Sequence, residues 1–124
     1  MGASITFLED NEELREVLAE VTRSELGEEA LSFGRFDDLV AHRTEVLQTK
    51  MAILDINLGA DQVTGVDVFH WLKDQGYTGK ICFLTGHAKA HPMVQAASEI
   101  GAEIWAKPMY ATTLCDAIRS VIKK

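Results

Sequence analysis

The chain has 124 residues, 47% hydrophobic and 25% charged, which is enough for one domain (1–124) with its own core. Nineteen acidic and twelve basic side chains give a net charge of -7, which repels a phosphate backbone and argues against direct binding to nucleic acid. Apolar runs are short and the N-terminus lacks a signal-peptide pattern, so we expect a cytoplasmic protein without a membrane segment. Cys82 and Cys115 lack metal-ligand spacing and are expected to be small apolar residues in a reducing compartment.

Five short apolar runs alternate with helical patterns at a spacing of about 25 residues, which is typical of repeated β-α units around a parallel sheet. The runs are mostly continuous, as expected for strands covered on both faces. The predicted strands are residues 4–8, 30–34, 51–54, 81–84 and 103–106. Helices are expected in the four intervals and after the last strand, which gives an α/β fold with five helices.

The first and last helices have the clearest patterns. Apolar residues lie on one face of each: Leu14, Val17, Leu18 and Val21 in the first, and Leu114, Ala117, Ile118, Val121 and Ile122 in the last. Asp10 and Glu13 have capping-box spacing at the first helix, and Thr112 or Thr113 is expected to cap the last.

Glycine and loop positions complete the chain-order pattern. Gly27, Gly76 and Gly101 each follow a helical pattern, where a positive φ ends a helix at least steric cost. Residues 56–64 show no periodicity and are expected to form a loop with a functional role.

Polar residues follow four of the five predicted strands. In an open parallel sheet these strand ends meet where ligands bind. The candidates are Glu9, Asp10, Asp55, Thr85 and Lys107. Three neighbouring carboxylates repel by about 4 kcal/mol per pair at an intermediate dielectric, which predicts a bound cation. Hard oxygen donors favour Mg²⁺ over zinc.

The remaining polar groups indicate phosphate chemistry. Lys107 supplies a compact positive charge and Thr85 a hydroxyl donor, both suited to the oxygens of a phosphoryl group in transfer. This leaves Asp55 as the nucleophile. Taken singly, Asp10 would also suit a helix cap and Asp55 an ordinary turn; their combination with Lys107 favours the site.

Four motifs resemble those of response regulator receiver domains, in the same order and spacing over nearly the whole chain. They are Ile-Thr-Phe-Leu-Glu-Asp-Asn at 5–11, Ile-Leu-Asp at 53–55, Leu-Thr-Gly-His at 84–87 and Ala-Lys-Pro at 106–108. The resemblance implies a flavodoxin-like, doubly wound sheet with strand order 2-1-3-4-5. It also implies a two-component phosphorelay protein with Mg²⁺ as its cofactor.

The resemblance further implies roles for the acidic residues. Asp55 matches the aspartate that takes a phosphoryl group from a sensor histidine kinase or a histidine phosphotransfer protein. Asp10 matches the direct metal ligand, and Glu9 the neighbouring acid that often acts through water. Asn57 occupies the position whose backbone carbonyl completes the metal shell.

The family pattern also covers the later motifs. Thr85 matches the switch hydroxyl and Lys107 the phosphate-binding lysine, with the peptide bond to Pro108 expected to be cis. His87 occupies a position that influences hydrolysis of the acyl phosphate, although a surface histidine is an equally good interpretation.

Two departures from the family pattern bear on signalling. The family glycine usually comes eight residues after the acceptor, whereas Gly65 comes ten after Asp55, so the loop is about two residues longer; Leu58 is followed by Gly59, without the usual proline. The usual aromatic position three before the lysine holds Ile104. Strand alternation places Trp105 on the other side of the sheet, so it should not replace the missing ring.

The sequence therefore predicts a phosphoacceptor switch that catalyses only its own phosphorylation and dephosphorylation, with no turnover of a separate substrate. The fourth and fifth helices and the fifth strand would form the face read by a downstream protein target or output domain, and that face could also form a dimer. Whether the domain stands alone or was cut from a larger regulator or hybrid kinase stays open.

Two alternatives remain from the residues. An aspartyl-phosphate phosphatase would use a similar nucleophile and metal, but Asn57 stands where such an enzyme places its second aspartate. A degenerate receiver used as a phosphorylation-independent scaffold would fit the altered loop and the missing aromatic residue.

Overall fold

Five parallel strands form one sheet in a computed structural model that describes residues 2–56, 58, 63–86, 91–107 and 111–122. The strands are β1 (Ile5–Leu8), β2 (Ala30–Phe33), β3 (Met51–Asp55), β4 (Lys80–Thr85) and β5 (Glu103–Ala106). Their order is β2-β1-β3-β4-β5, and every adjacent pair is parallel. The predicted doubly wound sheet is confirmed, and strand order reverses beside β1 and β3, where such folds bind ligands.

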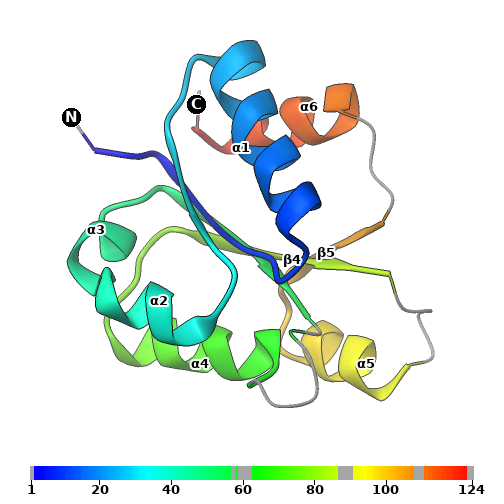
Figure 1. Ribbon diagram of the computed structural model, residues 1–124. Coiled ribbons are helices and arrows are strands. Elements are labelled where there is room, and N and C mark those ends of the chain that lie inside the picture. Colours follow the sequence, from blue (N-terminus) through cyan, green and yellow to red (C-terminus); the bar gives the residue numbers. More distant parts are fainter. Residues whose placement is uncertain (1, 57, 59–62, 87–90, 108–110, 123–124) are drawn as a thin grey trace.

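Helices cover both faces of the sheet (Figure 1). They are α1 (Glu12–Leu26), α2 (Phe36–Ala41), α3 (Arg43–Leu47), α4 (Gly65–Asp74), α5 (Pro92–Glu99) and α6 (Ala111–Ile122). Buried residues of α1 and α6 share one core cluster, and those of α2 to α5 share the other. The two clusters lie on opposite faces of β3 and β4, because residues that alternate along these strands enter different clusters.

The described residues form six helices, one more than the five predicted. The second interval divides at His42, which has φ -109° and ψ 29° and lies between α2 and α3. Its backbone N–H bonds to Leu39 rather than continuing the α-helical pattern, while its ring Nδ1 lies 2.9 Å from the carbonyl oxygen of Asp38. The histidine ring thus contacts the Asp38 carbonyl to which the backbone N–H of His42 would have donated if the α-helix had continued.

The predicted caps of the first and last helices are wrong. α1 is capped by Asn11, whose Oδ1 accepts from the N–H of Leu14 at 3.0 Å, so Asp10 lies outside the helix. α6 already begins at Ala111, which places Thr112 and Thr113 within its first turn. Helix ends depend on local side-chain competition that apolar spacing does not reveal.

The buried face of α1 differs from the predicted one at Val17. Val17 is 55% exposed, whereas Leu18, Thr22 and Leu26 are buried. Thr22 can be buried because its hydroxyl donates to the carbonyl of Leu18 at 2.7 Å. Leu14 and Val21 are partly buried against the same core cluster, so the apolar pattern predicted the helix and most of its buried face, and only Val17 was wrong.

The other boundaries agree closely with the prediction. Strand ends differ by at most one residue, and Asp55 and Thr85 are the last residues of β3 and β4. The three glycines expected to end helices have positive φ values of 66°, 85° and 78°: Gly27, Gly76 and Gly101. Among the described residues, none of the helices has the length and apolar character needed to cross a bilayer.

Candidate functional site

Three carboxylates meet at the carboxyl ends of β1 and β3. Glu9 and Asp10 follow β1, and Asp55 ends the adjacent β3, so parallel pairing brings them to one edge. One carboxylate oxygen from each lies within 4.8 Å of the others. Glu9 is 2% exposed and Asp55 6%, whereas Asp10 is exposed. The cluster therefore has two buried acids behind one that faces solvent.

Lys107 supplies a positive charge to this cluster. Its Nζ lies 2.7 Å from Oε1 of Glu9 and 3.3 Å from Oδ2 of Asp55. The lysine side chain is 24% exposed, so these ion pairs are only partly screened by water. The predicted lysine and both buried acids thus lie together, although they are far apart in the sequence.

The backbone after β1 is held by several hydrogen bonds. The N–H of Asn11 donates to Oε2 of Glu9 at 3.1 Å, and the N–H of Glu9 donates to the carbonyl of Phe33 at 3.0 Å. Arg15 reaches back to donate Nη1 to the carbonyl oxygen of Glu9 at 2.9 Å. The sequence interpretation assigned no role to Asn11, which ends the first motif, or to Arg15, because their contacts with Glu9 depend on the local backbone geometry.

Gly65 explains how closely α4 approaches the backbone of Asp55. A Cβ on Gly65 would lie 2.5 Å from the carbonyl oxygen of Asp55 and 2.9 Å from Cα of Ile56. The N–H of Gly65 instead donates to the carbonyl of Ile56 at 2.8 Å. Despite the longer loop, the glycine ten residues on therefore packs directly against the backbone of β3.

The electrostatics of the cluster disfavour its fully ionised form in the absence of a cation. The pKa of Asp55 is raised from 3.8 to about 7, first by burial and then by the charge of Glu9, against the lowering effect of Lys107. Burial opposes the charge of Lys107, but its hydrogen bond to Glu9 and the charges of both acids raise its pKa overall. Among the residues that the structure describes, the three carboxylates outnumber the one ammonium beside them.

Thr85 and Lys107 are connected through the backbone. Thr85 is 3% exposed at the end of β4, next to β3, and its carbonyl accepts from the N–H of Lys107 at 2.7 Å. This hydrogen bond joins the carboxyl ends of β4 and β5. The predictions on Asn57, Gly59, His87 and the cis bond to Pro108 lie outside the described residues.

Ile104 and Trp105 lie on opposite sides of β5, as strand alternation predicts. Trp105 is 9% exposed within the core cluster under α1 and α6, whereas Ile104 packs against the other cluster. Nε1 of Trp105 donates to Oε2 of Glu103 at 2.6 Å. The tryptophan therefore does not occupy the position of the family's aromatic residue.

The donor set suits a hard divalent cation. Glu9, Asp10 and Asp55 offer carboxylate oxygens, the ligands that Mg²⁺ prefers. One of the three, Asp10, is exposed to solvent among the described residues. The residues present therefore fit a magnesium site, with their excess negative charge as the observation that supports it.

The comparison with known proteins gives a family assignment. The model of the response regulator receiver domain matches residues 5–119. The chain belongs to this family. Receiver domains are phosphoacceptor switches of two-component systems that interact with kinases and output domains, and they do not turn over a separate substrate. No curated protein matches the sequence.

Solved receiver structures share the fold at low sequence identity. Chemotaxis protein CheY4 of Vibrio cholerae is 20% identical with a TM-score of 0.78, covering 98% of this chain and 100% of its own. The beryllofluoride-activated NtrC4 receiver domain dimer is 18% identical with a TM-score of 0.79, covering 96% of this chain and 95% of that one. NtrX of Brucella abortus is 22% identical with a TM-score of 0.83, covering 99% of this chain but 27% of NtrX.

Proposed function

We propose that Asp55 is the phosphoacceptor of a Mg²⁺-dependent receiver switch, which takes its phosphoryl group from a sensor histidine kinase or a histidine phosphotransfer protein. The supporting observation is the cluster of three carboxylates within 4.8 Å, with the Lys107 ammonium 3.3 Å from Asp55. An acid buried only for stability would be expected to have its charge fully compensated. Among the described residues, three carboxylates share one ammonium, a balance that suits a cation-binding site.

In the proposed reaction, an oxygen of Asp55 forms a bond to phosphorus as the bond from phosphorus to the donor imidazole nitrogen breaks. The imidazole keeps the electron pair, and Asp55 becomes an acyl phosphate. When bound, Mg²⁺ supplies positive charge that offsets the carboxylates and the phosphoryl oxygens. Asp10 and Asp55 would bind it directly, Glu9 through water, and Asn57 through its backbone carbonyl.

Lys107 and Thr85 then recognise the new group. The Lys107 ammonium moves from the carboxylate of Asp55 to a phosphoryl oxygen, and the Thr85 hydroxyl donates to another. Because the N–H of Lys107 bonds to the carbonyl of Thr85, both movements displace the same end of β4 and β5. This displacement would shift an existing equilibrium between conformations of the face formed by α5, β5 and α6. α5 and α6 are the fourth and fifth helices of the sequence prediction.

That face is where we place the partners. A downstream target, an output domain or a second copy in a dimer would read it, while the kinase or phosphotransfer protein approaches the acidic cluster. Ile104 has no ring to turn inward, so the signal would pass mainly through the backbone that joins Thr85 to Lys107. The expected compartment is the cytoplasm.

The test is intact mass spectrometry after incubation with Mg²⁺ and acetyl phosphate. Wild type should gain the mass of one phosphoryl group, while Asp55→Asn and a metal-free sample should gain none. Asp74→Asn is a matched control, because it removes an exposed carboxylate from α4. It should be phosphorylated like wild type.

One observation favours a phosphorylation-independent scaffold as the second candidate. The switch position of β5 holds Ile104, which packs on the core rather than offering a ring that could turn. A scaffold predicts no mass gain and partner binding that is insensitive to Mg²⁺ and to Asp55→Asn. Phosphorylation of Asp55, or any dependence of binding on it, would exclude this alternative.

A further inference from the structure

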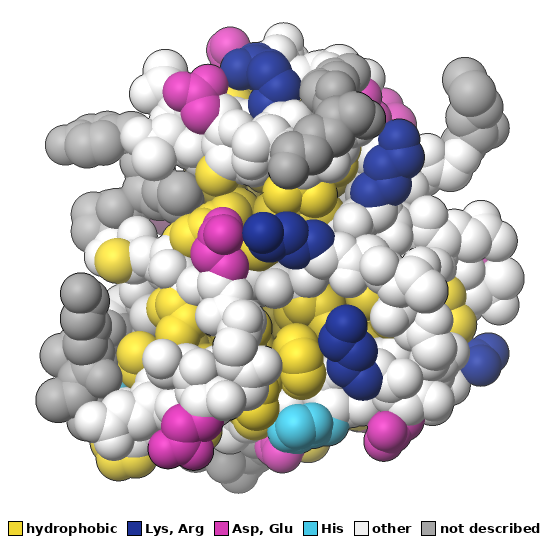
Figure 2. Space-filling view, turned by 180° about the vertical axis from the view of Figure 1, so that it is seen from behind, with side chains coloured by type: hydrophobic (Ala, Val, Ile, Leu, Met, Phe, Trp, Pro, Cys, Tyr) yellow, Lys and Arg dark blue, Asp and Glu magenta, His cyan; other side chains and the backbone are white. Residues whose placement is uncertain are grey.

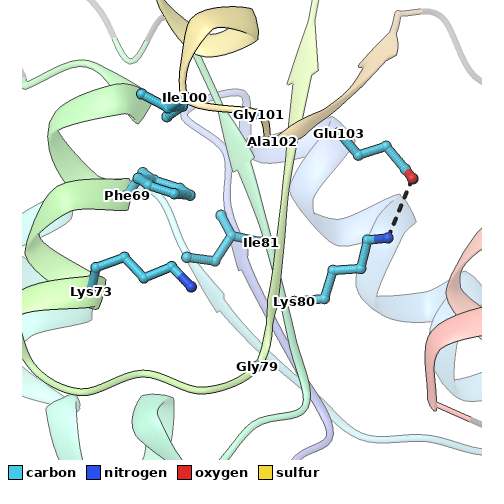
Figure 3. A pocket seen from close by; sticks show the side chains of 9 residues that line it. All are labelled: Phe69, Lys73, Gly79, Lys80, Ile81, Ile100, Gly101, Ala102 and Glu103. Carbon is cyan, nitrogen blue, oxygen red and sulfur yellow. Dashed lines mark ion pairs between the residues drawn. The ribbon is translucent and has the colours of Figure 1, made fainter.

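A pocket lies at the amino ends of β4 and β5, whereas the acidic cluster lies beyond the carboxyl ends of the strands. Its volume is about 610 Å³, within the range of ligand-binding pockets. Figure 3 shows its walls: Phe69 and Lys73 come from α4, Lys80 and Ile81 from β4, Ile100 follows α5, and Glu103 begins β5. We call this pocket the α4–α5 groove.

The floor of the groove is formed by apolar side chains that are firmly packed, whereas backbone and charged side chains line the rest of it. Ile81 is 5% exposed within the core, and Phe69 packs with its ring centroid 6.1 Å from that of Phe83. Ile100 is partly buried against the same core cluster. Hydrophobic side chains also surface beside lysine or arginine on the side of the molecule shown in Figure 2. An apolar side chain of a partner could therefore pack here and be shielded from water without rearrangement of the floor.

The charged rim of the groove is positive. Glu103 is already engaged, since one of its oxygens pairs with Lys80 at 3.4 Å and the other accepts from Trp105 at 2.6 Å. Lys73 lies with its Nζ 5.6 Å from the centre of the Phe69 ring. Within the described part of the chain, no carboxylate pairs with Lys73. A chain with a net charge of -7 thus presents a surplus cation beside an apolar floor.

We propose that the α4–α5 groove docks an acidic segment of a partner protein, with an apolar side chain on Phe69 and Ile81 and a carboxylate against Lys73. The charge of Lys73 favours a carboxylate on the partner, and the apolar floor favours an apolar side chain next to that carboxylate. An apolar centre with a half-exposed charged rim is the anatomy of a protein interface. A small-molecule site would instead enclose most of its ligand.

The location of the groove separates this docking from phosphoryl transfer. Phe69, Ile81 and Glu103 belong to the amino-terminal side of β4 and β5, while Asp55 ends β3 at the opposite edge. A segment bound in the groove would leave the acidic cluster accessible to a phosphodonor. Docking here goes beyond the proposed function and does not depend on phosphorylation.

The test uses a synthetic helix-forming peptide with one leucine flanked by glutamates, titrated by calorimetry and by amide shifts in NMR spectra. Saturable binding is expected, with shifts at the residues that line the groove. Lys73→Glu should weaken binding by about tenfold or more, and Lys73→Gln by less. Lys73 is exposed, so Lys73→Gln should nearly keep the wild-type melting temperature, and Lys73→Glu should lower it by a few degrees at most, because it places a negative charge in the last turn of α4.

Arg23→Glu is the matched control, because it makes the same change of charge on α1, which packs on the other face of the sheet. It should bind within about twofold of wild type, and Asp55→Asn should bind normally whatever the outcome of the phosphorylation test. A peptide with serine in place of leucine should bind weakly.

Four results would overturn the proposal: no binding, shifts outside the groove, equal losses in Lys73→Glu and Arg23→Glu, or equal binding of the serine peptide. Indole-3-acetate binding as tightly as the peptide would indicate a small-molecule site instead. Concentration-dependent dimerisation abolished by Lys73→Glu would indicate that a second copy occupies the groove.

Discussion

The buried polar groups at the two ends of the sheet differ in charge and in hydrogen bonding. At the carboxyl end, Glu9 and Asp55 are buried as acids with a single described ammonium nearby. At the amino end, the buried groups are neutral and satisfy one another: the hydroxyl of Thr49 lies 3.0 Å from that of Thr6 and 3.2 Å from that of Tyr77, and it donates to Val46 at 2.7 Å.

This difference separates stability from function within one fold. Neutral, fully paired hydroxyls stabilise the folded state at any ordinary pH and need no cofactor. Crowded carboxylates destabilise the folded state unless a cation binds, so the stability of the carboxyl end depends on cation binding. Four substitutions should break or sharpen the contrast, and they follow from the largest expected effect to the smallest.

Gly65→Ala should be the most damaging change at the carboxyl end. The added Cβ would lie 2.5 Å from the carbonyl oxygen of Asp55, and backbone cannot move aside cheaply. We expect a loss of about 3 kcal/mol in urea unfolding, together with slower phosphorylation by acetyl phosphate. Gly86→Ala is the control, since no described atom lies within 4 Å of its added Cβ. Equal stability of the two variants would contradict the close packing.

The charge deficit should appear as an unusual dependence of stability on pH. In the metal-free protein the pKa of Asp55 is about 7, against 3.8 for the ordinary group, so the folded state binds the extra proton. Stability should therefore fall as pH rises from about 4 to 7, by up to about 1.4 kcal/mol per pH unit from this group. Thermal melts over this pH range give the unfolding free energies of wild type and Asp55→Asn, and the difference between the two isolates the effect of this group.

Magnesium should reverse this loss, because it favours the ionised carboxylates. We expect Mg²⁺ to raise the melting temperature of wild type at pH 8 more than at pH 5, and to leave Asp55→Asn nearly unchanged. Asp116→Asn removes a carboxylate with a 76% exposed side chain and should behave like wild type. A magnesium shift of equal size in Asp55→Asn would place the cation elsewhere.

The amino end should show the contrasting behaviour. Thr49→Val leaves the hydroxyls of Thr6 and Tyr77 without this partner and should cost about 1–2 kcal/mol. The pKa of Tyr77 is about 12, raised mainly by burial, so nothing in this cluster titrates near neutrality. Urea unfolding should give the same loss at pH 6 and pH 8, with and without Mg²⁺. A loss that changed with Mg²⁺ would mean that the two ends are coupled.

The sequence predicted the sheet and the acidic cluster because both depend on short, strong patterns. Continuous apolar runs fixed the strands to within one residue, and parallel pairing then brought Asp10, Asp55 and Lys107 to one edge. These residues needed no side-chain geometry to be identified.

The features that were missed depend on exact contacts. Asn11 rather than Asp10 caps α1, and His42 interrupts the second interval, since each side chain competes locally for a backbone group. The neutral cluster around Thr49 and the support from Arg15 arise from tertiary packing between distant segments. Polar residues of this kind have no periodicity, so a sequence pattern does not mark them.

The smallest expected effect tests the support that Arg15 gives to Glu9. A Cβ on Gly34 would lie 2.5 Å from Nη1 of Arg15, at the far end of a flexible side chain that can swing away. Gly34→Ala should therefore change stability by less than about 1 kcal/mol, yet displace the guanidinium from the carbonyl of Glu9. We expect about a two- to fivefold weaker affinity for Mg²⁺, measured by calorimetry, because Glu9 is held less firmly.

A double-mutant cycle with Arg15→Ala separates this effect from a general disturbance of the loop. If the alanine at position 34 acts by displacing the guanidinium, it should have no further effect on Mg²⁺ affinity once Arg15 is gone. Independent losses that multiply would show that Gly34 affects the site by another route. Unchanged affinity in both single variants would show that the hydrogen bonds from Asn11 and to Phe33 suffice to hold Glu9, and that the carboxyl end tolerates more freedom than its crowding suggests.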